Sequence, residues 1–180
     1  VSKNAKYRRY LIDNIEFSHP LNIVIGQRGV GKTTTLVQHL LENCDENVRS
    51  HEILYIPTDH LLIGDKTLYS IAEEFSLNGG KYIAFDEIHK YDNWSMELKS
   101  INETFTDLNI LASGSSALEI YKGTHDLSRR AVVYKMEGLS FREYLELNLG
   151  VKLSKVSLDY LLEDHECFAQ EIISIVKQVK

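Results

Sequence analysis

The sequence contains few of the residues that characterise secreted and membrane proteins. Only two of its 180 residues are cysteine and two are proline. Two isolated cysteines, Cys44 and Cys167, do not make a disulfide framework, which favours a reducing, cytoplasmic environment. The longest purely apolar runs have about five residues, too few to cross a bilayer, and no stretch reads as a secretory signal. We therefore expect a cytoplasmic protein that does not use a membrane.

An excess of positive charge is also missing. The formal net charge is −6, from 20 basic and 26 acidic side chains. This balance argues against a general nucleic-acid surface, and the small basic patch at residues 3–9 reads as a solvated chain end. The seven histidines form no zinc-like pair with the cysteines. Hydrophobic residues make up 43% of the chain, as in a globular protein that buries a core.

Short apolar runs recur along the chain and predict strands that are buried on both faces, as in a parallel sheet. They lie at residues 21–25, 53–57, 81–85 and 109–112, with a weaker run at 132–135.

The segments between these runs have the spacing of amphipathic helices. In residues 94–105, for example, apolar side chains recur at i, i+4, i+7 and i+11. Asp65 is the predicted N-cap of the helix before the third strand. Ser140 and Glu143 form a capping-box pattern, and Gly150 suits the end of that helix. The alternation of strand and helix predicts an α/β fold with helices on both faces of the sheet.

A glycine-rich loop directly follows the first predicted strand. Its sequence, GQRGVGKTT, fits the pattern G-x-x-x-x-G-K-[ST] of nucleotide-binding P-loops. The glycines let successive N–H groups face one concavity for phosphate oxygens, and the next helix directs its N-terminal dipole there. The predicted nucleotide-binding residues are Gly26, Gln27, Arg28, Gly29, Val30, Gly31, Lys32, Thr33 and Thr34.

Side chains of this loop have distinct predicted roles. Lys32 would bring its ammonium group to the β- and γ-phosphates, and the Thr33 hydroxyl would hold Mg²⁺. Thr34 either reaches the α-phosphate or only supports the helix start. Arg28 points to solvent in the favoured interpretation, with a phosphate contact as the alternative.

A second motif, KYIAFDEIHK at residues 81–90, carries two acids at the end of a predicted strand. Open parallel sheets bind ligands at the carboxyl ends of their strands. Asp86 would complete the metal site begun by Thr33, and Glu87 would orient a water and accept its proton as a general base. His89 either tunes this carboxylate or packs at the rim.

The Asp86-Glu87 pair behind a P-loop resembles the additional-strand class of P-loop NTPases. The resemblance implies a three-layer sandwich whose parallel sheet has about five strands in the order 5-1-4-3-2. The stretch NILASGSSALEI at residues 109–120 resembles the sensor-1 position of AAA+ ATPases, where a polar side chain contacts the γ-phosphate or the attacking water. Ser113 is the first candidate and Ser115 the second, with a turn of small residues as the alternative.

Four segments together resemble the AAA+ superfamily ATPases of the AAA_14 type, which are usually followed by a DUF4143 C-terminal domain. The segments are GQRGVGKTTTL, IAFDEIHKYDNW, LASGSSALEI and SRRAVVYKMEGLSFREYL. The resemblance implies ATP and ADP as ligands, Mg²⁺ as the cofactor and possible assembly into a homo-oligomer. In AAA+ assemblies an arginine after the sensor-1 region reaches a neighbour's γ-phosphate, a role open to Arg129 and Arg130. A surface basic pair beside nearby acids is the alternative.

The domain organisation follows from these motifs and from the chain ends. The chain opens with Val1 rather than methionine and closes inside a predicted helix, so we expect a piece of a longer protein. Residues 1–150 should form the P-loop ATPase core. Residues 151–180 should form a helical extension that begins a further region.

Three functions fit the motifs. The leading one is an Mg²⁺-dependent ATPase whose catalytic candidates are Glu87, Lys32, Ser113, Arg129 and Arg130. The second is a slow-turnover, nucleotide-gated interaction module that controls a protein partner or a further C-terminal domain. The third, a small-molecule kinase, is disfavoured because Glu87 directly follows Asp86.

Overall fold

The computed structural model describes residues 7–44, 51–59, 66–115, 127 and 129–179. The chain divides into two compact units, Val1–Gly138 and Leu139–Lys180. Each unit is described by itself. The expected domain boundary at residue 150 falls inside the second unit, and that division stays a prediction.

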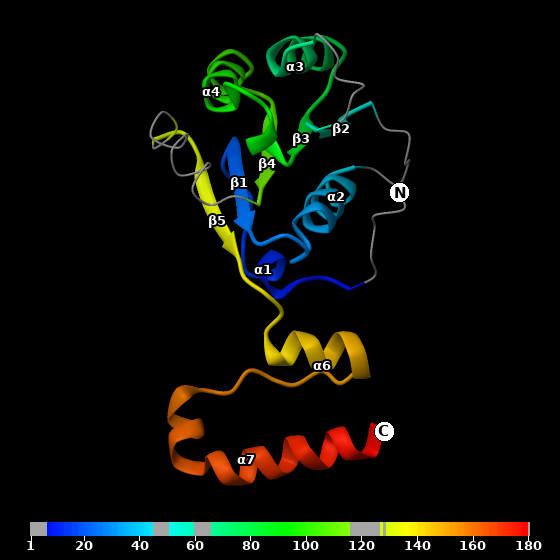
Figure 1. The fold of residues 1–180 in the computed structure, drawn as a ribbon, viewed down its shortest axis with the longest axis vertical. Coiled ribbons are helices and arrows are strands. Elements are labelled where there is room, and N and C mark those ends of the chain that lie inside the picture. The colour runs from blue at the N-terminus through cyan, green and yellow to red at the C-terminus, as the bar shows by residue number, and fades with distance from the viewer. Residues whose placement is uncertain (1–6, 45–50, 60–65, 116–126, 128, 180) are drawn as a thin grey trace. The chain divides into compact units, whose positions relative to one another are not determined.

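The first unit alternates strands and helices (Figure 1). Its elements, in chain order, are α1 (Tyr10–Asp13), β1 (Leu21–Gly26), α2 (Lys32–Glu42), β2 (Ile53–Pro57), α3 (Leu68–Leu77), β3 (Tyr82–Asp86), the 3-10 helix η2 (Ile88–Lys90), α4 (Trp94–Thr104), β4 (Asn109–Gly114) and β5 (Val132–Met136). All five predicted strands are present. The short elements α1 and η2 were not predicted.

The five strands form one parallel sheet in the order β2-β3-β4-β1-β5. Read from the other edge, this is the predicted order 5-1-4-3-2, which is confirmed. Strand β4 lies between β1, which leads into the glycine loop, and β3, which ends at Asp86. The carboxyl ends of these three strands therefore meet at one edge of the sheet.

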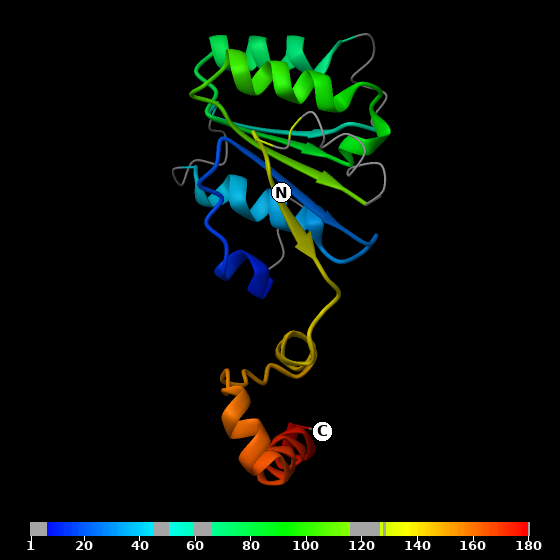
Figure 2. The ribbon, with the colours of Figure 1, turned by 90° about the vertical axis from the view of Figure 1, so that its left-hand side faces the viewer.

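The sheet separates two apolar cores (Figure 2). Helices α3 and α4 cover one face, and α2 covers the other. Along β1, Ile23 and Ile25 belong to the core under α3 and α4, whereas Val24 belongs to the core under α2. Because successive strand residues point to opposite faces, both faces of β1 need apolar side chains. This is why the strands appear in the sequence as continuous apolar runs.

Local sequence determines where the helices begin, and the predicted N-cap of α3 needs a correction. Helix α3 begins after Thr67, whose hydroxyl accepts a hydrogen bond from the Ser70 N–H at 3.0 Å. The predicted N-cap, Asp65, lies outside the described residues, and the cap is two residues later. Threonine in extended conformation suits this position because its oxygen satisfies one of the helix's unpaired donors. In α4 the predicted apolar stripe of Trp94, Leu98 and Ile101 is buried.

The second unit contains α6 (Phe141–Leu149) and α7 (Leu158–Val179). The predicted capping box is confirmed: the Glu143 N–H donates to the Ser140 hydroxyl at 3.2 Å, and the Ser140 N–H donates to the Glu143 carboxylate at 2.9 Å. Gly150 ends α6 in the left-handed conformation, with φ of 68°. Helix α7 is interrupted at Asp164. None of the helices in the described ranges has the length and apolar character needed to cross a membrane.

Candidate nucleotide-binding site

The glycine loop connects β1 to α2 at the carboxyl edge of the sheet. Gly29 and Gly31 have φ of 85° and 103°, a conformation that side-chain-bearing residues adopt at a cost. Gly26 is needed for a different reason. A Cβ atom at this position would lie 2.3 Å from the carbonyl oxygen of Met136 on β5. Two glycines therefore shape the turn, and the third permits close packing against the neighbouring strand.

Helix α2 begins at Lys32 with its N-terminal end directed to this loop. Its N-cap is Gly31, and no side chain within the described residues caps the first turn. The first turn carries no acid. The helix's own side chains therefore neither accept hydrogen bonds from its first backbone N–H groups nor neutralise the positive end of its dipole. This end of the helix suits a bound anion.

Lys32 folds back over the loop. Its Nζ donates to the carbonyl oxygens of Gly26 and Gln27, each at 3.0 Å, and the residue is only 3% exposed. Burial lowers the Lys32 pKa, while the negative charges of Glu87 and then Asp86 act in the opposite direction. The ammonium group is thus held between the loop and the two acids.

Asp86 accepts hydrogen bonds from three hydroxyl groups. The Thr33 Oγ1 and Tyr55 OH each donate to its Oδ2 at 2.6 Å, and the Ser113 Oγ donates to its Oδ1. The Thr33 hydroxyl and the carboxylate thus offer two adjacent hard oxygen donors, which is the ligand type that Mg²⁺ prefers. Among the described residues, no group of three or more His, Cys, Asp or Glu side chains is arranged so that it could hold a metal ion. A cation here would rely on Thr33, Asp86, water and phosphate oxygens.

Strand β2 and the residue that follows it, Thr58, supply two contacts that the sequence did not predict. Tyr55 reaches Asp86 from β2, and burial together with this bond raises the pKa of its phenol. Thr58 donates from its Oγ1 to the carbonyl oxygens of Asp86 and Glu87, each at 2.9 Å. The available signal was the strand order, because it places β2 beside β3. The pattern did not show that the side chains of Tyr55 and Thr58 contact Asp86 and Glu87.

Glu87 lies one residue beyond β3 in a left-handed conformation, with φ of 57° and ψ of 38°. Its N–H donates to the Ser113 hydroxyl at 3.2 Å. Its carboxylate accepts from the Ser115 Oγ at 3.1 Å and lies 3.7 Å from the Lys90 Nζ. The side chain is 23% exposed, so solvent water can reach it.

Arg9 is a further contact that the sequence did not predict, since the basic start of the chain was interpreted as a solvated end. Its guanidinium donates to the carbonyl oxygens of Glu137 and Gly138 at 3.0 and 3.1 Å, and also to that of Val30. One cation therefore connects the glycine loop to the residues that follow β5.

The remaining predicted loop residues differ in exposure. Gln27 and Arg28 are exposed, and Val30 and Thr34 are half-buried. The favoured interpretation that Arg28 points to solvent, with a phosphate contact as the alternative, stays a prediction.

Arg129 and Arg130 lie at the opposite edge of the sheet. They precede β5, whose first residue is paired with Asn22 near the start of β1. A five-residue strand spans about 16 Å, so both arginines lie far from their own chain's loop. Arg129 is exposed, and the Arg130 Nη2 lies 2.6 Å from the Glu103 Oε1. A role toward a neighbouring subunit stays a prediction.

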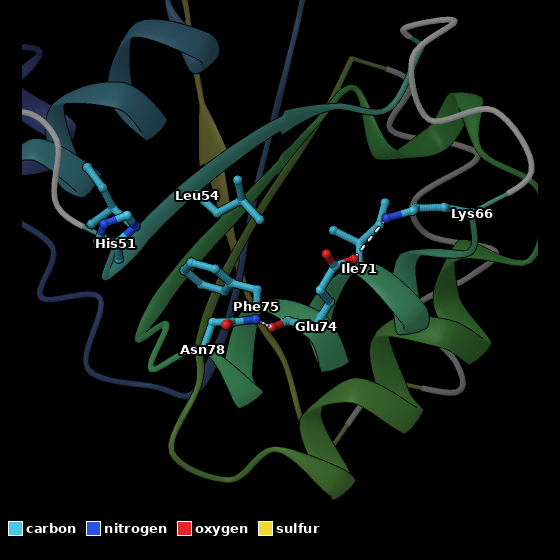
Figure 3. Close-up of a pocket in the computed structure, with 8 residues that line it drawn as sticks. His51, Leu54, Lys66, Ile71, Glu74, Phe75 and Asn78 are labelled. Atoms are coloured by element: carbon cyan, nitrogen blue, oxygen red, sulfur yellow. Dashed lines mark hydrogen bonds and ion pairs between the residues drawn. The ribbon is translucent and has the colours of Figure 1, made fainter.

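A hollow of about 400 Å³ lies elsewhere in the first unit, between β2 and α3 (Figure 3). Leu54, Ile71 and Phe75 contribute apolar surface, and an ion pair joins Lys66 and Glu74 at 2.8 Å. None of the described motif residues lines this hollow. It is separate from the candidate site.

The chain matches a family model and two curated relatives. The family model of the AAA domain, AAA_14, matches residues 18–145. The chain is 31% identical over 152 residues to uncharacterized protein MJ1637 of Methanocaldococcus jannaschii, covering 81% of this chain and 32% of that protein. It is 25% identical over 175 residues to uncharacterized protein MJ1544 of the same organism, covering 84% of this chain and 38% of that protein. The chain thus spans about a third of the length of these curated relatives.

Among solved structures, the chain resembles C. elegans PCH-2, with a TM-score of 0.47 and 15% identity, covering 83% of this chain and 46% of that one. The family match covers the glycine loop, both acids and all five strands. It indicates a nucleotide-binding, ATPase-like P-loop domain. The chain therefore belongs to the AAA domain family.

Proposed function

We propose that this chain binds ATP with Mg²⁺ at residues 26–34 and hydrolyses it to ADP and phosphate. One observation carries the proposal: the Thr33 hydroxyl lies 2.6 Å from the Asp86 carboxylate, although 53 residues separate them in the sequence. The two motifs on which phosphate and metal binding depend are thus brought together at the carboxyl edge of the sheet.

The loop and Lys32 account for phosphate binding. Backbone N–H groups of the loop and of the first turn of α2 suit phosphate oxygens. Within the described residues, the Lys32 ammonium donates to the carbonyl oxygens of Gly26 and Gln27. On ATP binding it would exchange these bonds for contacts with the β- and γ-phosphates. The positive charge would stabilise the negative charge that spreads over the phosphoryl oxygens during transfer.

Thr33 and Asp86 are the residues that would hold Mg²⁺. A bound Mg²⁺ would polarise the phosphoryl group and neutralise part of its charge. Tyr55 and Ser113 fix the Asp86 carboxylate from two further strands. Asp86 is therefore oriented before any ligand arrives.

In this proposal, Glu87 acts on water. Its carboxylate is partly exposed at the same edge of the sheet and close enough to Lys32 to influence the lysine pKa. It would orient a water molecule and accept its proton during attack on the γ-phosphate. Ser113, the predicted sensor-1 residue, contacts both Asp86 and the Glu87 N–H.

The test separates binding from turnover. Lys32→Ala should weaken ATP affinity by about 100-fold, a loss typical of a charged contact to phosphate. Glu87→Gln should leave ATP affinity within about threefold and lower the turnover number by about 100-fold. Lys66→Ala and Glu73→Gln, both exposed on or beside α3, are matched controls. Equal ATP binding by wild type and Lys32→Ala would contradict the site.

A slow-turnover switch is the second candidate, and the Arg9 contacts favour it. Because Arg9 binds both the loop carbonyl of Val30 and the residues that end the first unit, a change in the loop can alter that connection. A very low steady-state rate that Glu87→Gln does not change, with tight ATP binding, would favour the switch over the ATPase.

We also propose that the chain forms a homo-oligomer and that it acts with a protein partner or a further C-terminal domain. If Arg129 or Arg130 acts on a neighbouring subunit, specific activity should rise with protein concentration. The double variant Arg129→Ala/Arg130→Ala should then abolish this rise while ATP binding is retained. A concentration-independent activity that the double variant leaves intact would assign the two arginines to the surface.

A further inference from the structure

The two serines at the end of β4 serve different carboxylates. Ser113 lies in β4 (Asn109–Gly114), and Ser115 is the first residue after this strand. Ser113 donates to Asp86, whereas Ser115 donates to Glu87 at 3.1 Å. The metal-binding acid and the water-orienting acid thus each have their own hydroxyl donor.

His89 completes the contacts of Ser115. The His89 Nδ1 lies 3.4 Å from the Ser115 backbone nitrogen, and its Nε2 lies 3.2 Å from the Ser115 Oγ. Glu87, Ser115 and His89 are all partly buried, with the His89 side chain 13% exposed. The three residues form a connected hydrogen-bonded group at the carboxyl edge of the sheet.

The directions of these hydrogen bonds determine one consistent arrangement. A backbone N–H can only donate, so the Nδ1 of His89 must be the unprotonated nitrogen. The neutral imidazole then carries its proton on Nε2 and donates to the Ser115 Oγ. Because an ionised carboxylate only accepts, Ser115 in turn donates its own proton to Glu87. Every hydrogen in the chain from His89 to Glu87 therefore has an acceptor.

We propose that Ser115 and His89 are positioning residues that hold the Glu87 carboxylate in the orientation it needs to activate water. The inference rests on the proposed function, in which Glu87 is the general base. Ser115 makes the direct contact, and His89 acts through Ser115 by orienting its hydroxyl.

Lys90 competes with Ser115 for the Glu87 carboxylate. The Lys90 Nζ lies 3.7 Å from the Glu87 carboxylate and 2.7 Å from the Asp59 carboxylate. Without Ser115, a Glu87 carboxylate drawn toward Lys90 would leave the orientation required for catalysis. Small displacements of a catalytic group reduce rate strongly while ligand binding is maintained.

The arrangement is not that of a serine nucleophile with its activating triad. In such a triad the second imidazole nitrogen is held by a carboxylate. Here the Nδ1 of His89 faces a backbone N–H, and Glu87 contacts the serine itself. The geometry therefore supports orientation of Glu87 and no covalent role for Ser115.

Single-turnover ATP hydrolysis with enzyme in excess is the primary measurement, with ATP affinity and thermal unfolding measured on the same samples. Ser115→Ala should lower the hydrolysis rate by about 10- to 100-fold with ATP affinity within about twofold of wild type. Ser115→Thr, which keeps the hydroxyl, should recover most of the rate. Ser100→Ala is the matched control, since Ser100 is exposed on α4 and donates to the Met96 carbonyl.

Substitutions of His89 test its indirect role. His89→Gln can place an amide N–H near the position of Nε2 and should retain most of the rate. His89→Ala should lower the rate by about three- to tenfold, less than Ser115→Ala, because it removes only the group that orients the serine. His165→Ala, exposed on α7, is the control. Equal rates for His89→Ala and wild type would remove His89 from the proposal.

A double-substitution cycle distinguishes this inference from the proposed function. In a Glu87→Gln background, Ser115→Ala should have almost no further effect on rate, because the two changes act on one group. If Glu87→Gln itself leaves the rate unchanged, the proposed function fails. If Glu87→Gln lowers the rate but Ser115→Ala does not, or if both losses simply multiply, only the positioning role is wrong. Loss of ATP affinity or of folding in both Ser115→Ala and Ser115→Thr would also overturn it, in favour of a structural role.

Discussion

The two halves of the candidate site are built from different groups. The loop half consists of backbone shaped by glycine, held by the Arg9 guanidinium and covered by Lys32. The acidic half consists of two carboxylates oriented by hydroxyl groups from α2, β2, β4 and the residue after β4. The loop half depends on close backbone packing, whereas the acidic half depends on individual side-chain hydrogen bonds.

This difference predicts that substitutions in the two halves affect ATP affinity differently with and without Mg²⁺. Changes in the loop half should weaken nucleotide binding whether or not Mg²⁺ is present, because the loop contacts phosphate directly. Changes around Asp86 should matter only when Mg²⁺ is present, because that carboxylate acts through the cation. Measuring ATP affinity with and without Mg²⁺ therefore assigns each variant to one half.

Gly26→Ala should have the largest effect. The added Cβ would meet the Met136 carbonyl oxygen at 2.3 Å, so the loop or β5 must move. Such overpacking costs about 1–3 kcal/mol of unfolding free energy. We expect a lower melting temperature and a loss of ATP affinity of about 100-fold in either metal condition. Gly138→Ala is the control, since no atom lies within 4 Å of its added Cβ. Wild-type ATP binding by Gly26→Ala would contradict the rigid loop.

Arg9→Ala should have the next largest effect. It removes charge-assisted hydrogen bonds to the loop and to the end of β5, each worth about 1.5–3 kcal/mol at most. ATP affinity should fall by about tenfold with and without Mg²⁺. Arg8→Ala provides the neighbouring control, because Arg8 forms exposed ion pairs with Asp13 and Glu42. A loss seen only with Mg²⁺ would place Arg9 in the other half of the site.

Tyr55→Phe tests the acidic half with a single oxygen atom. It removes one of three hydroxyl donors to Asp86, so Thr33 and Ser113 still hold the carboxylate. We expect ATP affinity to fall by about three- to fivefold in the presence of Mg²⁺ and to stay unchanged without it. Tyr134→Phe is the control, since among the described residues its hydroxyl makes only a long contact of 3.5 Å with the Glu16 carbonyl. An equal loss in both metal conditions would contradict the assignment.

The smallest expected effect is a pH dependence of stability from α2, the helix that follows the loop. Burial, and then the Arg8 charge, lower the pKa of His39, whose ring packs against Phe17 with centroids 4.7 Å apart. The unfolded chain therefore binds this proton more readily than the folded chain. The stability from neutral His39 is present above about pH 6.5, the unfolded pKa, and is lost as pH falls through the lower folded value. His39→Phe should make the unfolding free energy less dependent on pH between about 5 and 7. Identical slopes of unfolding free energy against pH for wild type and His39→Phe would contradict this expectation.

The sheet was predictable because its determinants are local. Each strand is a continuous apolar run, and the pair Asp86-Glu87 behind a P-loop indicated the strand order through its family resemblance. Helix caps were predictable where the pattern was complete, as in the capping box of Ser140 and Glu143. The cap of α3 was not, because two cap-forming residues, Asp65 and Thr67, lie close together and the sequence does not show which one ends the loop.

The contacts that orient the site were less accessible to sequence reasoning. The motifs predicted Lys32, Thr33 and Asp86, whose roles depend on a fixed spacing within a loop or strand. Tyr55 and Arg9 reach the site across 31 and 21 residues of sequence. Their contributions depend on strand register and side-chain direction, which a residue pattern does not contain.

The backbone of Glu87 has a consequence for evolution and for protein engineering. A glutamate in the left-handed region is less favourable than glycine there by about 1 kcal/mol. Glu87→Gly should therefore raise the free energy of unfolding, and it also removes the carboxylate. A selection scheme that rewards heat resistance alone would tend to discard this acid, so any such scheme needs a catalytic screen beside it.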